Sequence, residues 1–178
     1  YLLRAVNILR ERRPDVKVII TVSPIRYAKY GFHGSQLSKA TLLLAADQLI
    51  KETTLNRESS IDKESSISKE ISFNEEQGGA VVTYFPAYEI VNDELRDYRF
   101  YADDMLHPSS LAVEYIWQRM VETFFSDEAK TFLREWAPLK KGFSHRPLNP
   151  DGDEYKAFLA KLHAEAQLLK QRYKDMPL

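Results

Sequence analysis

The sequence predicts an α/β domain with a parallel sheet, followed by further helices. Two short runs rich in β-branched residues support this prediction, Val16-Lys-Val-Ile-Ile-Thr-Val22 and Ala80-Val-Val-Thr-Tyr-Phe85. Runs with so few charges are typical of strands covered on both faces, as in a parallel sheet. Amphipathic helical segments lie on either side of the first run, over residues 1–13 and 35–51. Helices that alternate with buried strands are the order of elements in an α/β domain.

Local signals mark where the first elements begin and end. Pro14 follows the helix over residues 1–13, and proline disrupts a helix because it lacks the amide hydrogen. Ser23-Pro24 ends the first strand, and a polar, aromatic loop follows as far as Gly34. Ser35 is the expected N-cap of the next helix. The buried side of that helix is expected to hold its apolar residues, which are Leu37, Leu42, Leu44, Ala45, Leu49 and Ile50.

The second half of the chain is expected to be mostly helical. A short helix is predicted over residues 88–95, and Pro108 suits the first position of a longer helix that ends near Phe125. Another helix is predicted over residues 126–137. After a Gly/Pro-rich link, residues 151–174 form a final amphipathic helix, which would also suit an oligomer interface.

These elements divide the chain into an α/β domain, residues 1–125, and a helical C-terminal extension, residues 126–178. Within the first part, residues 53–79 are rich in Ser, Glu and Lys and contain a tandem hexapeptide, Glu58-Ser-Ser-Ile-Asp-Lys63 followed by Glu64-Ser-Ser-Ile-Ser-Lys69. A connection of this length without apolar periodicity is typical of an insertion. We expect a solvated surface loop without chemistry.

Composition and charge exclude several classes of protein. The 178 residues are 44% hydrophobic and 29% charged, as in a soluble globular protein, and the formal net charge of −1 gives no electrostatic footprint for nucleic acid. No apolar run approaches the roughly 20 residues that a membrane-spanning helix needs. Cysteine is absent, which excludes disulfides and thiolate metal sites but assigns the protein to no compartment.

Asp104-Met-Leu-His107 is the segment with the clearest chemical potential. A carboxylate three residues before an imidazole, in a turn that precedes a helix, can accept the Nδ1 hydrogen and leave Nε2 free as a general base. In a parallel α/β sheet, the loops at the carboxyl ends of the strands carry the ligand site. The same spacing also makes a helix N-cap network with no catalytic role, and spacing alone does not separate the two interpretations.

Four segments, in order, connect the chain with a known family. They are Ile20-Thr-Val-Ser-Pro-Ile-Arg26, Gln36-Leu-Ser-Lys-Ala-Thr41, Tyr84-Phe-Pro-Ala-Tyr-Glu-Ile-Val91 and Asp93-Glu-Leu-Arg-Asp-Tyr-Arg-Phe-Tyr-Ala-Asp-Asp-Met-Leu-His-Pro108. Together they resemble the GSCFA family, which is similar to the SGNH/GDSL-like hydrolases. The resemblance implies a three-layer α/β/α, flavodoxin-like fold with a parallel sheet, incomplete in this chain. It also implies that Asp104 and His107 are the acid and base of a Ser-His-Asp triad.

The resemblance also implies that the nucleophile lies outside this chain. The family takes its name from a Gly-Ser-Cys-Phe-Ala block that would hold the catalytic serine, and this chain has no cysteine. The Gly-x-Asn-Asp signature of the wider superfamily is missing too, since Asn92-Asp93 lacks the preceding glycine. We therefore expect a C-terminal part of a longer protein, with the serine upstream of Tyr1, and no activity in this chain by itself.

Ser23, Arg26 and His33 are the candidate substrate-binding residues, because they lie on the loop expected to face the site. For Arg26 and His33, a plain surface position is the alternative. Ser23 and Ser35 are also the two serines considered as internal nucleophiles. Ser23 is followed by Pro24, which has no N–H to offer an oxyanion hole, and Ser35 suits a helix cap equally well.

The leading hypothesis is a serine esterase or acyl hydrolase that acts on a small-molecule or glycan ester and requires no cofactor. Asp103, Asp104 and His107 could contact a metal ion, but a catalytic site usually has three protein ligands and the spacing offers no further histidine, so no metal is predicted. The alternative is a non-catalytic binding or scaffold protein that retains the fold. The missing nucleophile motivates it, as does Tyr27, which stands where the family is expected to have a histidine.

Overall fold

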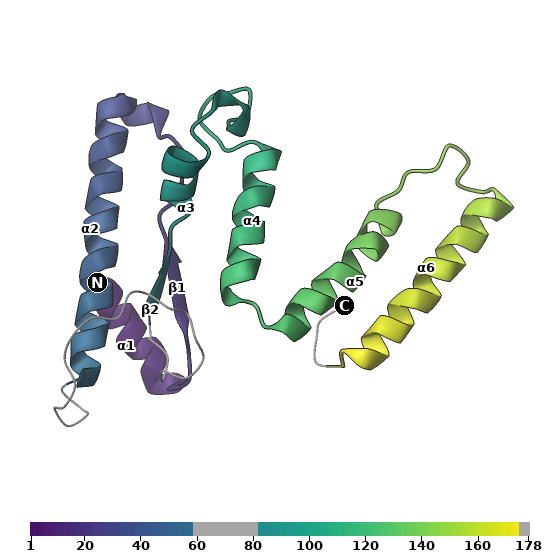
Figure 1. Ribbon diagram of the computed structural model, residues 1–178, viewed down its shortest axis with the longest axis horizontal. Coiled ribbons are helices and arrows are strands. Elements are labelled where there is room, and N and C mark those ends of the chain that lie inside the picture. Colours follow the sequence, from purple (N-terminus) through teal and green to yellow (C-terminus); the bar gives the residue numbers. More distant parts are fainter. Residues whose placement is uncertain (59–81, 175–178) are drawn as a thin grey trace. The chain divides into compact units, whose positions relative to one another are not determined.

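The computed structural model describes residues 1–58 and 82–174 (Figure 1). The chain forms two compact units, Tyr1–Met120 and Val121–Leu178. Most of the insertion expected over residues 53–79 lies outside the described residues. Its first residues, 53–58, belong to a helix.

A parallel two-stranded sheet lies at the centre of the first unit. Strand β1 (Val18–Thr21) pairs with β2 (Val82–Phe85) in a register that places Val18 opposite Val82 and Thr21 opposite Phe85. In Figure 1 the strands lie between α2 (Gly31–Glu58) on one side and α4 (Ser110–Phe124) on the other. The predicted fold class is thus confirmed as a partial α/β domain followed by C-terminal helices.

Helix α1 (Leu2–Arg12) and α2 pack on one face of this sheet. The core there consists of Val6, Leu49 and Val82, with Leu3, Val18, Ile20 and Ile50 packed around them. The expectation that β1 is covered on both faces is wrong, because Ile19, which points to the opposite face, is 42% exposed. The helices bury alternate residues of β1, and side chains alternate between the faces of a strand.

Helix α2 begins earlier and ends later than predicted. A 3-10 turn (Ala28–Tyr30) precedes it, and Gly31 adopts a φ of 69°, a left-handed conformation that glycine adopts without steric cost. Ser35 is therefore not the N-cap, and it lies inside the helix with a buried side chain. Its Oγ accepts a hydrogen bond of 3.0 Å from the backbone N–H of Tyr27.

The buried side of α2 also differs from the prediction. Leu49 is buried as expected, but three of the expected residues are exposed, namely Leu37, Leu42 and Leu44. The residues that turn inward instead are Ser35, Lys39, Ala46 and Thr53. Leucines occur on several sides of this helix, so their periodicity does not select one face. Contacts of Ser35 and Lys39 with the loop after β1 orient the helix.

After β2, the chain forms a short helix whose second part is a π-helical turn. The helix predicted over residues 88–95 is present as α3 (Ala87–Glu89) followed by the turn Ile90–Glu94. Glu94 at its end is bound by two side chains of α4: Arg119 Nη2 lies 2.7 Å from Glu94 Oε1, and the Tyr115 hydroxyl donates to the same oxygen. This cluster attaches α4 to the segment that follows the sheet.

Pro108 is not the first residue of α4, contrary to the prediction. The helix begins at Ser110, and Ser109 caps it with an Oγ that accepts from the backbone N–H of Ala112 at 3.3 Å. Pro108 instead forms an isolated antiparallel β-bridge with Tyr101. The bridge closes the loop that carries Asp104 and His107, so that Pro108 belongs to this loop and not to the helix.

The second unit contains a helical hairpin, in which α5 (Asp127–Phe143) packs against α6 (Asp153–Arg172). Its core is formed by Leu139, Leu162, Leu169 and Tyr173. Ser126, where the helix was predicted to begin, is the N-cap of α5, and its Oγ accepts a hydrogen bond from the Ala129 N–H at 3.2 Å. The predicted end near residue 137 is wrong, since α5 continues through Pro138 to Phe143. Burial of Leu139 against α6 residues, with Phe143 packed beside it, stabilises the turn after the proline.

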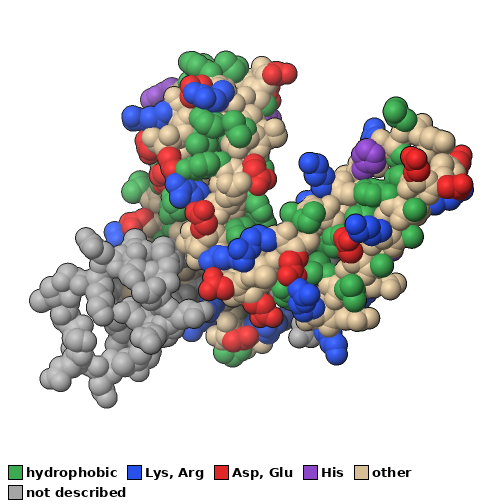
Figure 2. All heavy atoms as spheres, turned by 45° about the vertical axis from the view of Figure 1, so that its right-hand side comes forward, with side chains coloured by type: hydrophobic (Ala, Val, Ile, Leu, Met, Phe, Trp, Pro, Cys, Tyr) green, Lys and Arg blue, Asp and Glu red, His purple; other side chains and the backbone are tan. Residues whose placement is uncertain are grey.

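The surface mixes charges of both signs. Figure 2 shows acidic and basic side chains interspersed over the face that it presents, with hydrophobic side chains among them. The net charge of −1 agrees with this mixture. Within the described ranges, the structure has no helix with the length and apolar character needed to cross a membrane.

Candidate active site

Asp104 and His107 contact each other directly. Asp104 Oδ2 lies 2.5 Å from His107 Nδ1. The His107 side chain is 57% exposed and that of Asp104 is 45% exposed, so the pair sits at the surface. The predicted contact is thus confirmed. It uses Nδ1, and within residues 1–58 and 82–174 no hydrogen bond to Nε2 is found.

The turn between the two residues explains how they meet. Met105 adopts a φ of 59°, which is uncommon for a residue other than glycine. Asp104 Oδ1 accepts hydrogen bonds from the backbone N–H groups of Leu106, at 2.9 Å, and His107, at 3.0 Å. One carboxylate oxygen therefore holds the turn and the other holds the imidazole. The two interpretations of the motif, a cap of the backbone and an orienting acid, are both realised geometrically in one side chain.

The same contacts lower the pKa of Asp104 to about 2. The largest cause is the hydrogen bond from the His107 backbone N–H, followed by that from Leu106 and by the His107 ring. A hydrogen bond to the charged form favours that form. The carboxylate is thus ionised at neutral pH.

This pKa predicts how the turn responds to acid. Because the folded pKa lies below the ordinary value of 3.8, the stabilisation by Asp104 is present above that value and is lost as the pH falls through about 2. A titration followed by the ¹³C chemical shift of the Asp104 carboxyl carbon is expected to show a midpoint near 2. A midpoint at the ordinary value of 3.8 would contradict the hydrogen-bonded turn.

Backbone contacts place this loop at the carboxyl ends of the strands. The bridge between Tyr101 and Pro108 is accompanied by a hydrogen bond of 2.8 Å from Ala102 N–H to the His107 carbonyl. The N–H of Arg26, in the loop after β1, donates to the Leu106 carbonyl at 3.0 Å. The loop after β1 and the His107 loop are therefore joined where ligand sites of parallel sheets occur.

Lys39, a buried lysine of α2, binds the loop after β1. Lys39 of α2 donates through Nζ to the Ser23 carbonyl, and it lies 5.8 Å from the ring centre of Tyr88. Burial lowers the pKa of Lys39, because a charged ammonium is poorly solvated there. The sequence prediction missed this residue. Its only sequence signal is a lysine at helical spacing from Ser35, which is not specific.

The predicted substrate-binding residues have different positions. Arg26 lies beside the His107 loop, with its guanidinium 4.2 Å from the ring centre of Tyr101. Ser23 is exposed, and its Oγ accepts from the N–H of Ile25 at 3.3 Å. His33 is exposed in the first turn of α2. Among the described residues, the structure joins only Arg26 of these three to the His107 loop through a hydrogen bond.

A small hollow of about 360 Å³ lies beside Arg26. Its lining includes residues from the turn after β2 and from the segment before the motif, and it consists of Arg26, Val91, Asn92, Arg96, Asp97, Tyr98 and Tyr101. Tyr98 and Tyr101, which precede the motif by a few residues, both belong to this lining. The sequence analysis missed Asn92 and Arg96 in this role. The only sequence signal for these two residues is that they lie shortly before the Asp104–His107 motif.

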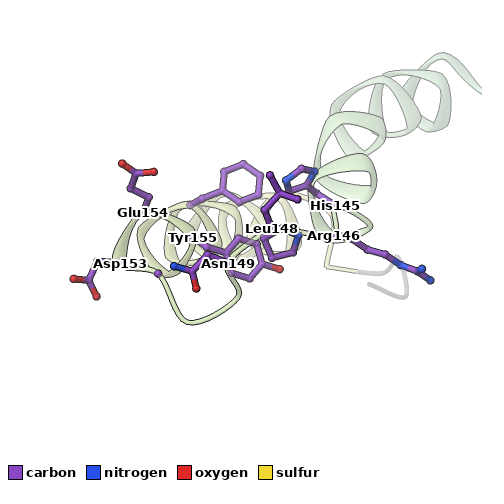
Figure 3. A pocket seen from close by; sticks show the side chains of 10 residues that line it. His145, Arg146, Leu148, Asn149, Asp153, Glu154 and Tyr155 are labelled. Carbon is purple, nitrogen blue, oxygen red and sulfur yellow. The ribbon is translucent and has the colours of Figure 1, made fainter.

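A larger hollow, of about 810 Å³, lies in the second unit between the end of α5 and the start of α6 (Figure 3). His145 lies near Leu148 there, and its ring is 6.1 Å from that of Phe158. The charged groups of Asp153 and Glu154 extend outward in Figure 3. The lining mixes polar and apolar residues, and it consists of His145, Arg146, Pro147, Leu148, Asn149, Gly152, Asp153, Glu154, Tyr155 and Phe158.

Among residues 1–58 and 82–174, no group of three or more His, Asp or Glu side chains is placed to hold a metal ion. Asp104 and His107 therefore lack a third ligand of this kind in the described part of the chain.

Comparisons with known proteins identify the family. The model of the GSCFA family matches residues 1–120, and that of the GSCFA domain protein, C-terminal domain, matches residues 136–178. No curated protein and no solved structure matches the chain. The first match covers the sheet, the loop after β1 and the Asp104–His107 turn, and the second covers most of the helical hairpin. The chain belongs to the GSCFA family.

Proposed function

We propose that the protein containing this chain is a serine esterase or acyl hydrolase of SGNH type, in which Asp104 and His107 are the acid and the base. The observation that carries the proposal is the contact of 2.5 Å between Asp104 Oδ2 and His107 Nδ1 in an exposed turn at the carboxyl ends of parallel strands. A histidine that acts as a general base needs a carboxylate that orients its ring, access to the substrate and a second ring nitrogen that can take up a proton.

In the proposed reaction, His107 Nε2 removes the hydroxyl proton of a serine as that oxygen attacks the ester carbonyl. The tetrahedral adduct then expels the alcohol, which takes the proton from His107, and an acyl-serine remains. Water, deprotonated by His107, releases the acid and restores the serine. Asp104 keeps the Nδ1 hydrogen in place and stabilises the imidazolium. A general base of this kind contributes about 10²–10⁴-fold to the rate.

The proposal assigns the serine to a segment outside the described residues. Ser35 is buried, and its Oγ is bound to the Tyr27 N–H. The Oγ of Ser23 accepts from Ile25, and the following Pro24 has no N–H. No serine hydroxyl of the described residues forms a hydrogen bond with the His107 ring. The family resemblance supplies the Gly-Ser-Cys-Phe-Ala block as the source of the nucleophile.

Labelling with a fluorophosphonate tests this proposal on the full-length protein that contains the chain. We expect one serine to be labelled, which peptide mapping would locate outside residues 1–178, and we expect His107→Ala to abolish labelling. His163→Ala is the matched control, since His163 is also exposed but packs against Phe143 in the second unit, with ring centres 5.2 Å apart.

Two outcomes would overturn the hydrolase proposal. Labelling that persists in a folded His107→Ala variant would remove His107 from the role of base. No labelling of the folded full-length wild type would favour the alternative, a binding or scaffold protein that retains the fold. Tyr27 in place of the histidine expected in the family is the feature that motivates this alternative.

A further inference from the structure

We propose that the hollow lined by Arg26, Arg96 and Tyr101, called here the arginine hollow, binds a carboxylate carried by the alcohol part of the ester. The inference extends the proposed function and depends on it only for the statement that the ligand is an ester. The statement that the hollow binds a carboxylate depends only on the positions of these residues. It would make the substrate an anionic ester rather than a neutral one.

The charges around the hollow support an anionic ligand. Two arginines, Arg26 and Arg96, belong to the lining. The one acidic residue of the lining, Asp97, is engaged by Arg99, whose Nη2 lies 3.0 Å from Asp97 Oδ2. The hollow therefore keeps an excess of positive charge. Guanidinium groups bind carboxylates through pairs of parallel hydrogen bonds, which makes arginine the preferred partner for this anion.

Arg26 is held in one orientation. Its guanidinium lies over the Tyr101 ring at 4.2 Å, and its side chain is only half-exposed. A guanidinium held over an aromatic face by a cation–π contact is less free to move than one in open solvent. Binding then orders fewer rotamers of Arg26 than binding to a free surface arginine would.

The hollow adjoins the residues on both sides of His107. Arg26 N–H donates to the carbonyl of Leu106, and Tyr101 forms the β-bridge with Pro108. A ligand in the hollow thus lies beside two residues that contact the segment holding the imidazole. The volume of about 360 Å³ lies at the small end of the range of ligand pockets, about 300–1,000 Å³. This size suits a small acidic group.

A pair of matched esters tests the inference in the full-length protein. We would compare kcat/KM for para-acetoxybenzoate and for its neutral methyl ester, which share the acetyl group and the ring. The wild type is expected to prefer the anion. Arg96→Gln is expected to lower this preference about tenfold, the effect of losing one charge-assisted hydrogen bond at a partly exposed site. Because both esters are measured in the same variant, an effect of Arg96→Gln that does not depend on the charge of the ligand cancels in the ratio of the two kcat/KM values.

Arg10→Gln is the matched control for charge. Arg10 is exposed in the last turn of α1, which precedes the amino end of β1, and its removal changes the net charge by the same amount. It should leave the preference unchanged. Arg26→Gln should lower the preference as well, and a thermal melt would show whether loss of the Tyr101 contact also destabilises the loop. Equal effects of Arg10→Gln and Arg96→Gln on the preference would overturn the inference.

A binding measurement separates the inference from the proposed function. The full-length protein would be titrated with para-acetamidobenzoate, which carries no ester, and with the neutral para-acetamidobenzamide, while backbone amides are followed by NMR. Carboxylate-dependent shifts at Arg26, Arg96 and Tyr101 support the hollow even if no ester is hydrolysed. Hydrolysis of both esters with no charge preference, and no such shifts, overturns the hollow and leaves the hydrolase proposal standing.

Discussion

Asp104→Asn is expected to lower kcat for ester hydrolysis by the full-length protein by about 10³–10⁴-fold, the loss typical of a triad whose acid becomes an amide. The asparagine Oδ1 can still accept from the N–H groups of Leu106 and His107, so the turn is retained. Its NH₂ group, however, would face His107 Nδ1, which favours the tautomer with the hydrogen on Nε2. That tautomer cannot accept the proton of the serine. Initial rates with a chromogenic ester measure the effect.

Asp104→Ala separates the two roles of this carboxylate. Alanine removes both the orienting contact and the two backbone hydrogen bonds that hold the left-handed Met105 turn. We therefore expect Asp104→Ala to lower the melting temperature as well as the rate, whereas Asp104→Asn lowers the rate at an almost unchanged melting temperature. If Asp104→Asn retained wild-type activity in a folded protein, Asp104 would be only a structural cap.

Leu49→Ala is expected to reduce the free energy of unfolding of the chain by about 2–5 kcal/mol, as other leucine-to-alanine changes in cores do. Leu49 is 4% exposed and packs with Val6 and Val82 between α2 and the sheet. The truncation would leave a cavity between a helix and a strand, where the backbone cannot close in. Urea unfolding followed by circular dichroism measures the change.

Leu44→Ala on the same helix is the matched control. Leu44 is 70% exposed, and its truncation is expected to change the unfolding free energy by less than about 0.5 kcal/mol. Both substitutions remove the same atoms from the same helix. Equal losses for the two variants would mean that α2 buries a different face from the one in the structure.

The two strands and the Asp104–His107 turn could be predicted because their signals are local. A β-branched run that ends at proline identifies β1 and β2, and an acid three residues before a histidine can reach it in a single turn. The cap of α5 at Ser126 is local in the same sense. Helix α2 was predicted less well. Its leucines lie on several sides, so the pattern did not identify the face that packs on the sheet.

The loop around the motif shows a second limit of prediction. Proline before a helix favours the first helical position, yet Pro108 pairs with Tyr101 and Ser109 becomes the cap. This outcome depends on the backbone of a residue seven positions earlier, which no helix signal contains. Likewise Pro138 was expected to end α5, but packing of Leu139 against α6 extends the helix beyond it.

By itself, the sequence determined the class of fold, the order of the elements, the contact between Asp104 and His107 and the resemblance to the GSCFA family. All of these depend on spacing along the chain over a few residues or on the order of whole segments. Only the tertiary structure decided that the backbone of Arg26 binds the His107 loop, that buried Lys39 binds the loop after β1 and that Arg96 lines the hollow. The physical reason is that these contacts link residues far apart in sequence, and pairing of two parallel strands brings their following loops together.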